Sequence, residues 1–115
     1  MTELTALRDE LRRFAKDRDW DQFHAPKNLA SALAVEAAEL LEPFQWLTED
    51  QSRNLTAVQS KAVRNELADV LIYLVRLADK LDVDLIAAAR DKISENAIKY
   101  PVEKAKGSMH KYSDL

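Results

Sequence analysis

Four acidic residues stand where the pattern of the chain otherwise places apolar side chains. Glu36 and Glu39 are three residues apart in "LAVEAAELLEPFQW", and Glu66 and Asp69 repeat that spacing in "VRNELADVLIYLV". Residues three apart on a helix lie on the same face, so each pair is predicted to point in one direction. If the two helices pack side by side in antiparallel orientation, all four carboxylates converge on one patch.

Such a patch needs a positive partner, because burying an ionised carboxylate costs on the order of several kcal/mol. A ligand set made only of oxygens suits hard cations, so we expect Mg²⁺, with Mn²⁺ as the alternative. A di-iron site is not expected, because neither His24 nor His110 completes a Glu-x-x-His motif. Glutamates at helical spacing are ordinarily solvated, but Asp69 is the only charged residue from Leu67 to Val75. Aspartate is also a poor helix former, so its position favours a metal site.

Apolar periodicity and capping residues predict an all-α chain. Proline residues divide the helices, and the segment "RDWDQFHAPK" reads as a loop. The predicted elements are a helix from Leu4 capped by Thr2, a helix capped by Asn28 and ended by Pro43, a short turn with capping-box residues Thr48 and Gln51, a long helix from about Thr56 to Leu81, and a last helix from Asp84 to before Pro101.

The middle of the long helix is apolar on nearly every side. Leu67, Val70 and Leu74 form one stripe, while Leu71 and Ile72 lie off it. A helix of this kind is buried on several sides. One chain of 115 residues has too little structure to cover it, so we expect a second subunit to do so.

The composition excludes several function classes. The net charge of −3, with 17 basic and 20 acidic residues, argues against binding to a nucleic-acid polymer. The single glycine, Gly107, rules out a glycine-rich phosphate loop, and the lack of cysteine rules out zinc–thiolate sites. We expect neither a leader sequence nor a membrane-spanning segment. We therefore expect the protein to be cytoplasmic. The length predicts one helical domain over residues 1–101 with a tail over 102–115.

The spacing Glu36-x-x-Glu39 followed by Glu66-x-x-Asp69 resembles the signature of the MazG-like nucleotide pyrophosphohydrolases, the all-α NTP pyrophosphatases. "RDWDQFHAPKNL", "EAAELLEPFQW", "ELADVLIYLVRLA", "NAIKYP" and "KYSDL" are similar to the dCTP pyrophosphatase branch. The similarity runs from about Leu4 to the C-terminus. It implies Mg²⁺-dependent hydrolysis of a nucleoside triphosphate, with dCTP or a modified dCTP foremost, to the monophosphate and pyrophosphate. That reaction is nucleotide-pool house-cleaning. The resemblance also implies a four-helix-bundle-type subunit, assembled as a homotetramer that is a dimer of dimers.

The resemblance also implies roles for individual residues. It places Glu36, Glu39, Glu66 and Asp69 at the metal and catalytic positions. His24 is a candidate substrate contact, with a structural hydrogen bond as the alternative. Some animal members carry a histidine near the position of Leu11 and arginines at the positions of Ala97, Ile98 and Lys99, so this chain differs from them there. The remaining expected contacts are Trp20 and Trp46 with the base, and Tyr73, Lys92, Asn96, Lys99 and Tyr100 with the sugar and phosphates.

Two alternatives remain at the level of sequence. The same chemistry can act on another triphosphate, such as dUTP or a damaged nucleotide. The chain can also be a catalytically silent helical oligomer that serves as a binding module.

Overall fold

The computed structural model describes residues 2–115, and those residues form helices and connecting turns without any β-strand. The predicted all-α class is therefore confirmed. The chain divides into two compact units, Met1–Asp82 and Val83–Leu115.

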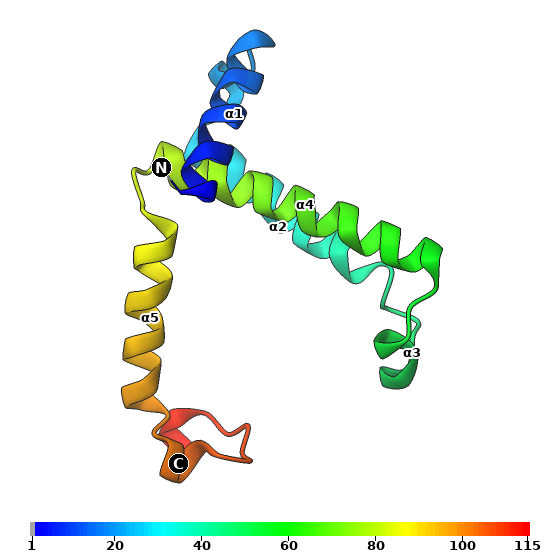
Figure 1. Ribbon diagram of the computed structural model, residues 1–115, viewed down its shortest axis with the longest axis vertical. Helices are drawn as coiled ribbons and strands as arrows, with labels where there is room; N and C mark the ends of the chain where they lie inside the picture. The colour runs from blue at the N-terminus through cyan, green and yellow to red at the C-terminus, as the bar shows by residue number, and fades with distance from the viewer. Residues whose placement is uncertain (1) are drawn as a thin grey trace. The chain divides into compact units, whose positions relative to one another are not determined.

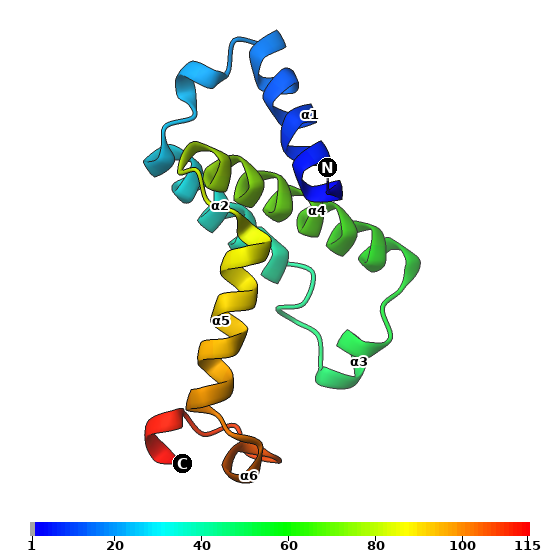
Figure 2. The same cartoon turned by 60° about the vertical axis from the view of Figure 1, so that its left-hand side comes forward.

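The first unit is built on a pair of long helices. α2 (Pro26–Leu41) and α4 (Ala57–Lys80) lie side by side and run in opposite directions (Figures 1 and 2). α1 (Glu3–Asp17) packs on α4 and is followed by the short 3₁₀ helix η1 (Asp21–Phe23). This antiparallel pair is the arrangement that the sequence requires for its two acidic motifs to meet.

Side-chain caps define where most of these helices begin. The Thr2 hydroxyl accepts from the Thr5 amide and opens α1. Thr48 and Gln51 form a complete capping box that opens α3 (Glu49–Arg53), as predicted. A second capping box, between Thr56 and Gln59, opens α4. The start of α4 is thus set by residues next to it in the sequence.

The predicted N-cap of α2 is wrong. α2 begins at Pro26, Ala25 is the residue before it, and Asn28 lies inside its first turn. The Asn28 side chain instead donates to the carbonyl oxygen of Phe23 at 3.1 Å. The cause is Pro26, because proline has no amide to leave unpaired at the first helical position and its φ angle is already helical.

Little of the first unit is buried within one chain. Its buried apolar side chains are Ala15 of α1, Leu29 of α2, and Val75 and Ala78 of α4. Before these residues on α4, three leucines are exposed, namely Leu67, Leu71 and Leu74, and Leu67 keeps 53% of its surface. The single chain therefore does not cover the helix that its sequence predicts to be buried.

The second unit consists of α5 (Leu85–Lys99), α6 (Val102–Ala105) and η2 (Tyr112–Asp114). The Asp84 side chain accepts from the Ala87 amide and opens α5, as predicted. The tail folds back on the end of α5, where the rings of Tyr100 and Tyr112 meet edge to face at 6.0 Å. Among residues 2–115, no helix has both the length and the apolar character needed to cross a membrane.

Candidate functional site

The pairing of α2 with α4 brings the acidic residues together. Glu36, Glu39 and Glu66 each offer a carboxylate oxygen, and these oxygens lie within 4.8 Å of one another. Asp69 stands one turn beyond Glu66 on α4, close enough for its charge to act on Glu36. We call these four residues the carboxylate cluster. The predicted convergence is confirmed for Glu36, Glu39 and Glu66, whereas Asp69 as a fourth ligand remains a prediction.

The cluster is electrostatically unfavourable without a cation. Burial of Glu36, together with the nearby Glu39, Glu66 and Asp69, raises the pKa of the Glu36 carboxyl to about 7. A proton on Glu36 allows it to donate to Glu39 or Glu66, whereas ionised carboxylates are acceptors only. Oε2 of Glu36 and Oε2 of Glu66 are buried and have no hydrogen-bond partner within the described chain. Buried acceptors without a donor are costly, so the site requires either a proton or a cation.

The donor set fits a hard divalent cation. The converging groups are all carboxylates, and two of their oxygens are left free by the rest of residues 2–115. Oxygen ligands of this kind are those that Mg²⁺ and Mn²⁺ bind.

The raised pKa of Glu36 predicts a pH-dependent stability in the absence of metal. The folded state holds the Glu36 proton more tightly than the unfolded state, whose value is near 4.5. The protonated Glu36 therefore makes its full contribution to the free energy of unfolding below about pH 4.5, and this contribution is lost as the pH rises through about 7. With a chelator present, we expect the melting temperature to fall as the pH rises from 5 to 8. The fall should be larger in the wild type than in Glu36→Gln.

The comparison with Glu36→Gln isolates this effect. The pKa of His24 is lowered, chiefly by burial, which gives His24 the opposite slope over part of the same range. His24 is present in both proteins, so its contribution cancels in the difference. Mg²⁺ should raise the melting temperature of the wild type and reduce its loss at high pH. Equal pH profiles for the two proteins would contradict the assignment of Glu36.

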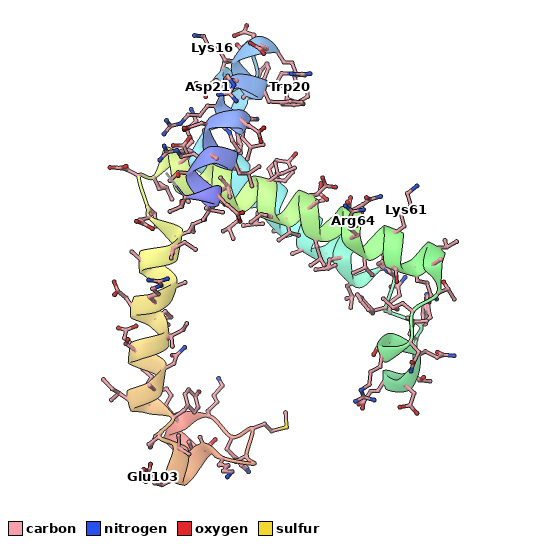
Figure 3. The ribbon with its side chains drawn as sticks, in the orientation of Figure 1. Lys16, Trp20, Asp21, Lys61, Arg64 and Glu103 are labelled. Carbon is pink, nitrogen blue, oxygen red and sulfur yellow. The ribbon has the colours of Figure 1, made fainter. Side chains whose placement is uncertain are left out.

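The two candidate base-stacking residues lie at the ends of helices, as predicted. Trp20 precedes η1 and packs edge to face against Phe14 at 5.7 Å, leaving 46% of its surface exposed. Figure 3 places Trp20 beside Asp21, beyond the C-terminal end of α1. Trp46 follows α2 and is 87% exposed. Trp46 therefore contributes little packing within its own chain.

His24 makes the structural hydrogen bond that was its alternative role. Its Nδ1 atom accepts from the guanidinium of Arg76, with Arg76 Nε at 3.3 Å and Nη2 at 3.0 Å. Arg76 lies on α4, is 4% exposed, and also donates to Asp21 at 3.0 Å. The motifs and spacings of the sequence did not predict a role for Arg76. The available signal was a lone arginine inside the apolar run "YLVRLA", where a charge needs a buried partner.

The remaining predicted contacts divide between the two units. Tyr73 lies on α4 one turn after Asp69 and is half-buried. The others are exposed residues of the second unit, where the Lys99 ammonium lies 5.1 Å from the centre of the Tyr112 ring. Their contact with a nucleotide remains a prediction. These residues are Lys92, Asn96 and Lys99 of α5 and Tyr100, which follows it.

Comparison with known proteins identifies relatives that cover most of the chain. The sequence model of the MazG-like family matches residues 32–115. The dCTP pyrophosphatase 1 of Mus musculus is 47% identical over 104 residues, which is 89% of this chain and 61% of the mouse protein. The dCTP pyrophosphatase 1 of Homo sapiens is 44% identical, with the same coverage. The chain thus spans about three fifths of the length of these curated relatives.

A solved structure supports the same relationship. The crystal structure of a pyrophosphatase from Archaeoglobus fulgidus superimposes with a TM-score of 0.83 at 40% sequence identity. The match covers 88% of this chain and 94% of the archaeal one.

Proposed function

The chain belongs to the MazG-like family, and on that premise we propose that it is a nucleoside triphosphate pyrophosphohydrolase. The reaction converts a deoxynucleoside triphosphate into the monophosphate and pyrophosphate. The observation that carries this proposal is the carboxylate cluster, with its two buried and unpartnered oxygens. The names of the mammalian and archaeal relatives, dCTP pyrophosphatase and pyrophosphatase, support it.

Glu36, Glu39, Glu66 and Asp69 are the residues that hold the divalent cation in this proposal. A bound Mg²⁺ or Mn²⁺ supplies positive charge that neutralises the triphosphate and favours the departure of pyrophosphate. A carboxylate oxygen of the cluster that is not engaged by the cation accepts the proton of the attacking water. Attack at the α-phosphorus releases the proposed products.

For the substrate, we propose dCTP or a modified dCTP. Trp20 and Trp46 supply flat surfaces on which a base stacks. Tyr73 on α4, with Lys92, Asn96, Lys99 and Tyr100 of the second unit, is proposed to bind the sugar and phosphates. The names of the mammalian relatives favour deoxycytidine over other bases. dUTP and damaged nucleotides are the substrates against which this choice is tested.

The experiment measures pyrophosphate release from a panel of canonical and modified nucleoside triphosphates, with and without Mg²⁺. We expect Mg²⁺-dependent release with dCTP or a modified dCTP turned over best. Best turnover of dUTP or another nucleotide corrects the substrate and leaves the reaction in place. If no triphosphate is hydrolysed while Mg²⁺ still stabilises the fold, the chain is a binding module.

We also propose that the active form is a homotetramer, a dimer of dimers. The exposed leucines Leu67, Leu71 and Leu74 on α4 form the apolar surface that a second copy would cover. Replacing Leu71 with glutamate should shift the sedimentation coefficient of the protein towards that of a smaller species. Lys61→Glu, an exposed change on the same helix (Figure 3), is the matched control. A wild-type chain that sediments as an active monomer at micromolar concentration contradicts the proposal.

A further inference from the structure

A buried arginine connects the Trp20–His24 segment to α4. Arg76 is 4% exposed, and its guanidinium reaches Asp21, His24 and Asp79. Asp21 is the first residue of η1 and His24 follows its last, whereas Asp79 lies one turn beyond Arg76 on α4. The guanidinium therefore ties a segment that carries two candidate nucleotide contacts to the helix that carries half of the carboxylate cluster.

The aspartates of this network have second cationic partners. Asp79 accepts from Arg12 of α1, whose Nε lies 2.8 Å from Asp79 Oδ2, and that ion pair lowers the pKa of Asp79. Asp21 accepts from Lys80 as well as from Arg76, and both bonds lower its pKa. Removing Arg76 consequently leaves each aspartate paired. The one group that loses its only donor is Nδ1 of His24.

Chemistry then fixes the tautomer of His24. Arginine offers only N–H donors, so a ring nitrogen in hydrogen-bond contact with it must carry a lone pair. Nδ1 is that nitrogen, and in a neutral imidazole the proton must sit on Nε2. Within the described chain, Nε2 has no hydrogen-bond partner and is not among the buried unpartnered atoms. It is therefore a donor open to a ligand.

Burial and the neighbouring positive charges favour the neutral form of the His24 ring. Burial is the main cause that lowers the pKa of His24, and the positive charges of Arg76 and Lys80 lower it further. Asp21 acts in the opposite direction without reversing the shift. From α1, Arg12 faces the network through Asp79.

We propose that Arg76 is a positioning residue that locks His24 as the Nε2–H tautomer and so aims a fixed hydrogen-bond donor at an oxygen of the bound nucleotide. This role of His24 towards substrate rests on the proposed function, whereas the tautomer lock does not. Nε2 keeps its proton whether the ring is in this neutral tautomer or protonated, so the donor does not depend on the charge of the ring. The acceptor is an oxygen of the phosphates or of the base.

The lock is tested by nitrogen-15 NMR of the histidine rings. His110→Gln removes the other histidine, so that His24 gives the only ring signals. We expect an unprotonated shift for Nδ1 and a protonated shift for Nε2 at neutral pH. In Arg76→Met, we expect a mixture of tautomers and a raised pKa. An unchanged tautomer and pKa in Arg76→Met, or a proton on Nδ1 in the unaltered site, overturns the lock.

The role of the donor is tested by a double-mutant cycle with dCTP as substrate. Arg76→Met should raise KM by roughly two- to tenfold, the loss expected for one misdirected hydrogen bond, with a smaller change in kcat. Glutamine at position 24 carries an amide that always donates, so in His24→Gln the same Arg76→Met change should alter KM by less than about twofold. Equal effects in the two backgrounds overturn the donor role.

Two further measurements test whether the effect is specific to Arg76 and whether the acceptor is an oxygen of the phosphates or of the base. Arg13→Met removes an exposed arginine of the same unit and should leave KM and the NMR spectrum unchanged. Inhibition by inorganic triphosphate, which lacks a base, should weaken in Arg76→Met only if the acceptor is a phosphate oxygen; weakening for dCTP alone assigns the base. If the wild type hydrolyses no nucleotide, the proposed function fails, while the NMR result still decides the lock.

Discussion

Replacing Glu39 with glutamine is expected to abolish pyrophosphate release. The amide keeps the size of the side chain but removes its negative charge, and one of the three converging oxygens is lost as an anionic ligand. Mutations around metal ligands typically cost roughly ten- to a hundredfold, so the loss of a ligand itself should cost at least about a hundredfold. Asp69→Asn should act in the same way. The measurement is turnover of dCTP at saturating Mg²⁺.

The fold should survive this change. Both variants remove one of several mutually repelling charges, so their stability without metal should equal or exceed that of the wild type. Glu49→Gln is a control of identical chemistry, because the Glu49 side chain on α3 is 91% exposed. Circular dichroism should show the same helix content in all these proteins. Full activity in Glu39→Gln or Asp69→Asn would remove the cluster from the mechanism.

Replacing Trp46 with alanine is expected to raise KM for dCTP by about ten- to a hundredfold. A base stacked on an aromatic ring gains roughly 1–3 kcal/mol, which corresponds to a change of that size. The turnover number should change less, since the carboxylate cluster is untouched. The indole ring is 87% exposed within its own chain, so the substitution removes little internal packing. Steady-state kinetics across a range of dCTP concentrations measures both constants.

Trp46→Phe is the conservative comparison, because it keeps an aromatic face and should recover part of the affinity. The melting temperature and the sedimentation coefficient of Trp46→Ala should match those of the wild type. An unchanged KM places the base elsewhere. A protein that unfolds or dissociates shows instead that Trp46 packs against another subunit.

The features that the sequence predicted correctly depend on neighbouring residues. Thr2, Thr48 and Asp84 cap helices through hydrogen bonds to amides three residues away, so the pattern can be read without a tertiary structure. The convergence of the carboxylates needed one further assumption, that the helices on either side of the connector pair in antiparallel orientation. Once the helices pair in that way, a spacing of three residues is sufficient to place both carboxylates of each motif on the face towards the other helix.

The features that the sequence could not predict depend on two competing local signals, on contacts between residues far apart in the chain, or on the assembly. Asn28 and Pro26 both signal a helix start, and only the geometry of the preceding turn decides between them. The contact between Arg76 and His24 joins residues 52 positions apart, which no local pattern specifies. The exposure of Leu71 depends on what covers α4, which is a property of the assembly and not of one chain.

The capping box of Thr56 and Gln59 has a consequence for insertions and deletions. Because these two side chains determine where α4 begins, the position of Glu66 is set by its separation from the N-cap residue Thr56. Insertions or deletions in the connector between Glu42 and Leu55 change the path of the chain without altering that separation. A change in the length of the connector therefore leaves the register of the acidic residues along α4 unaltered.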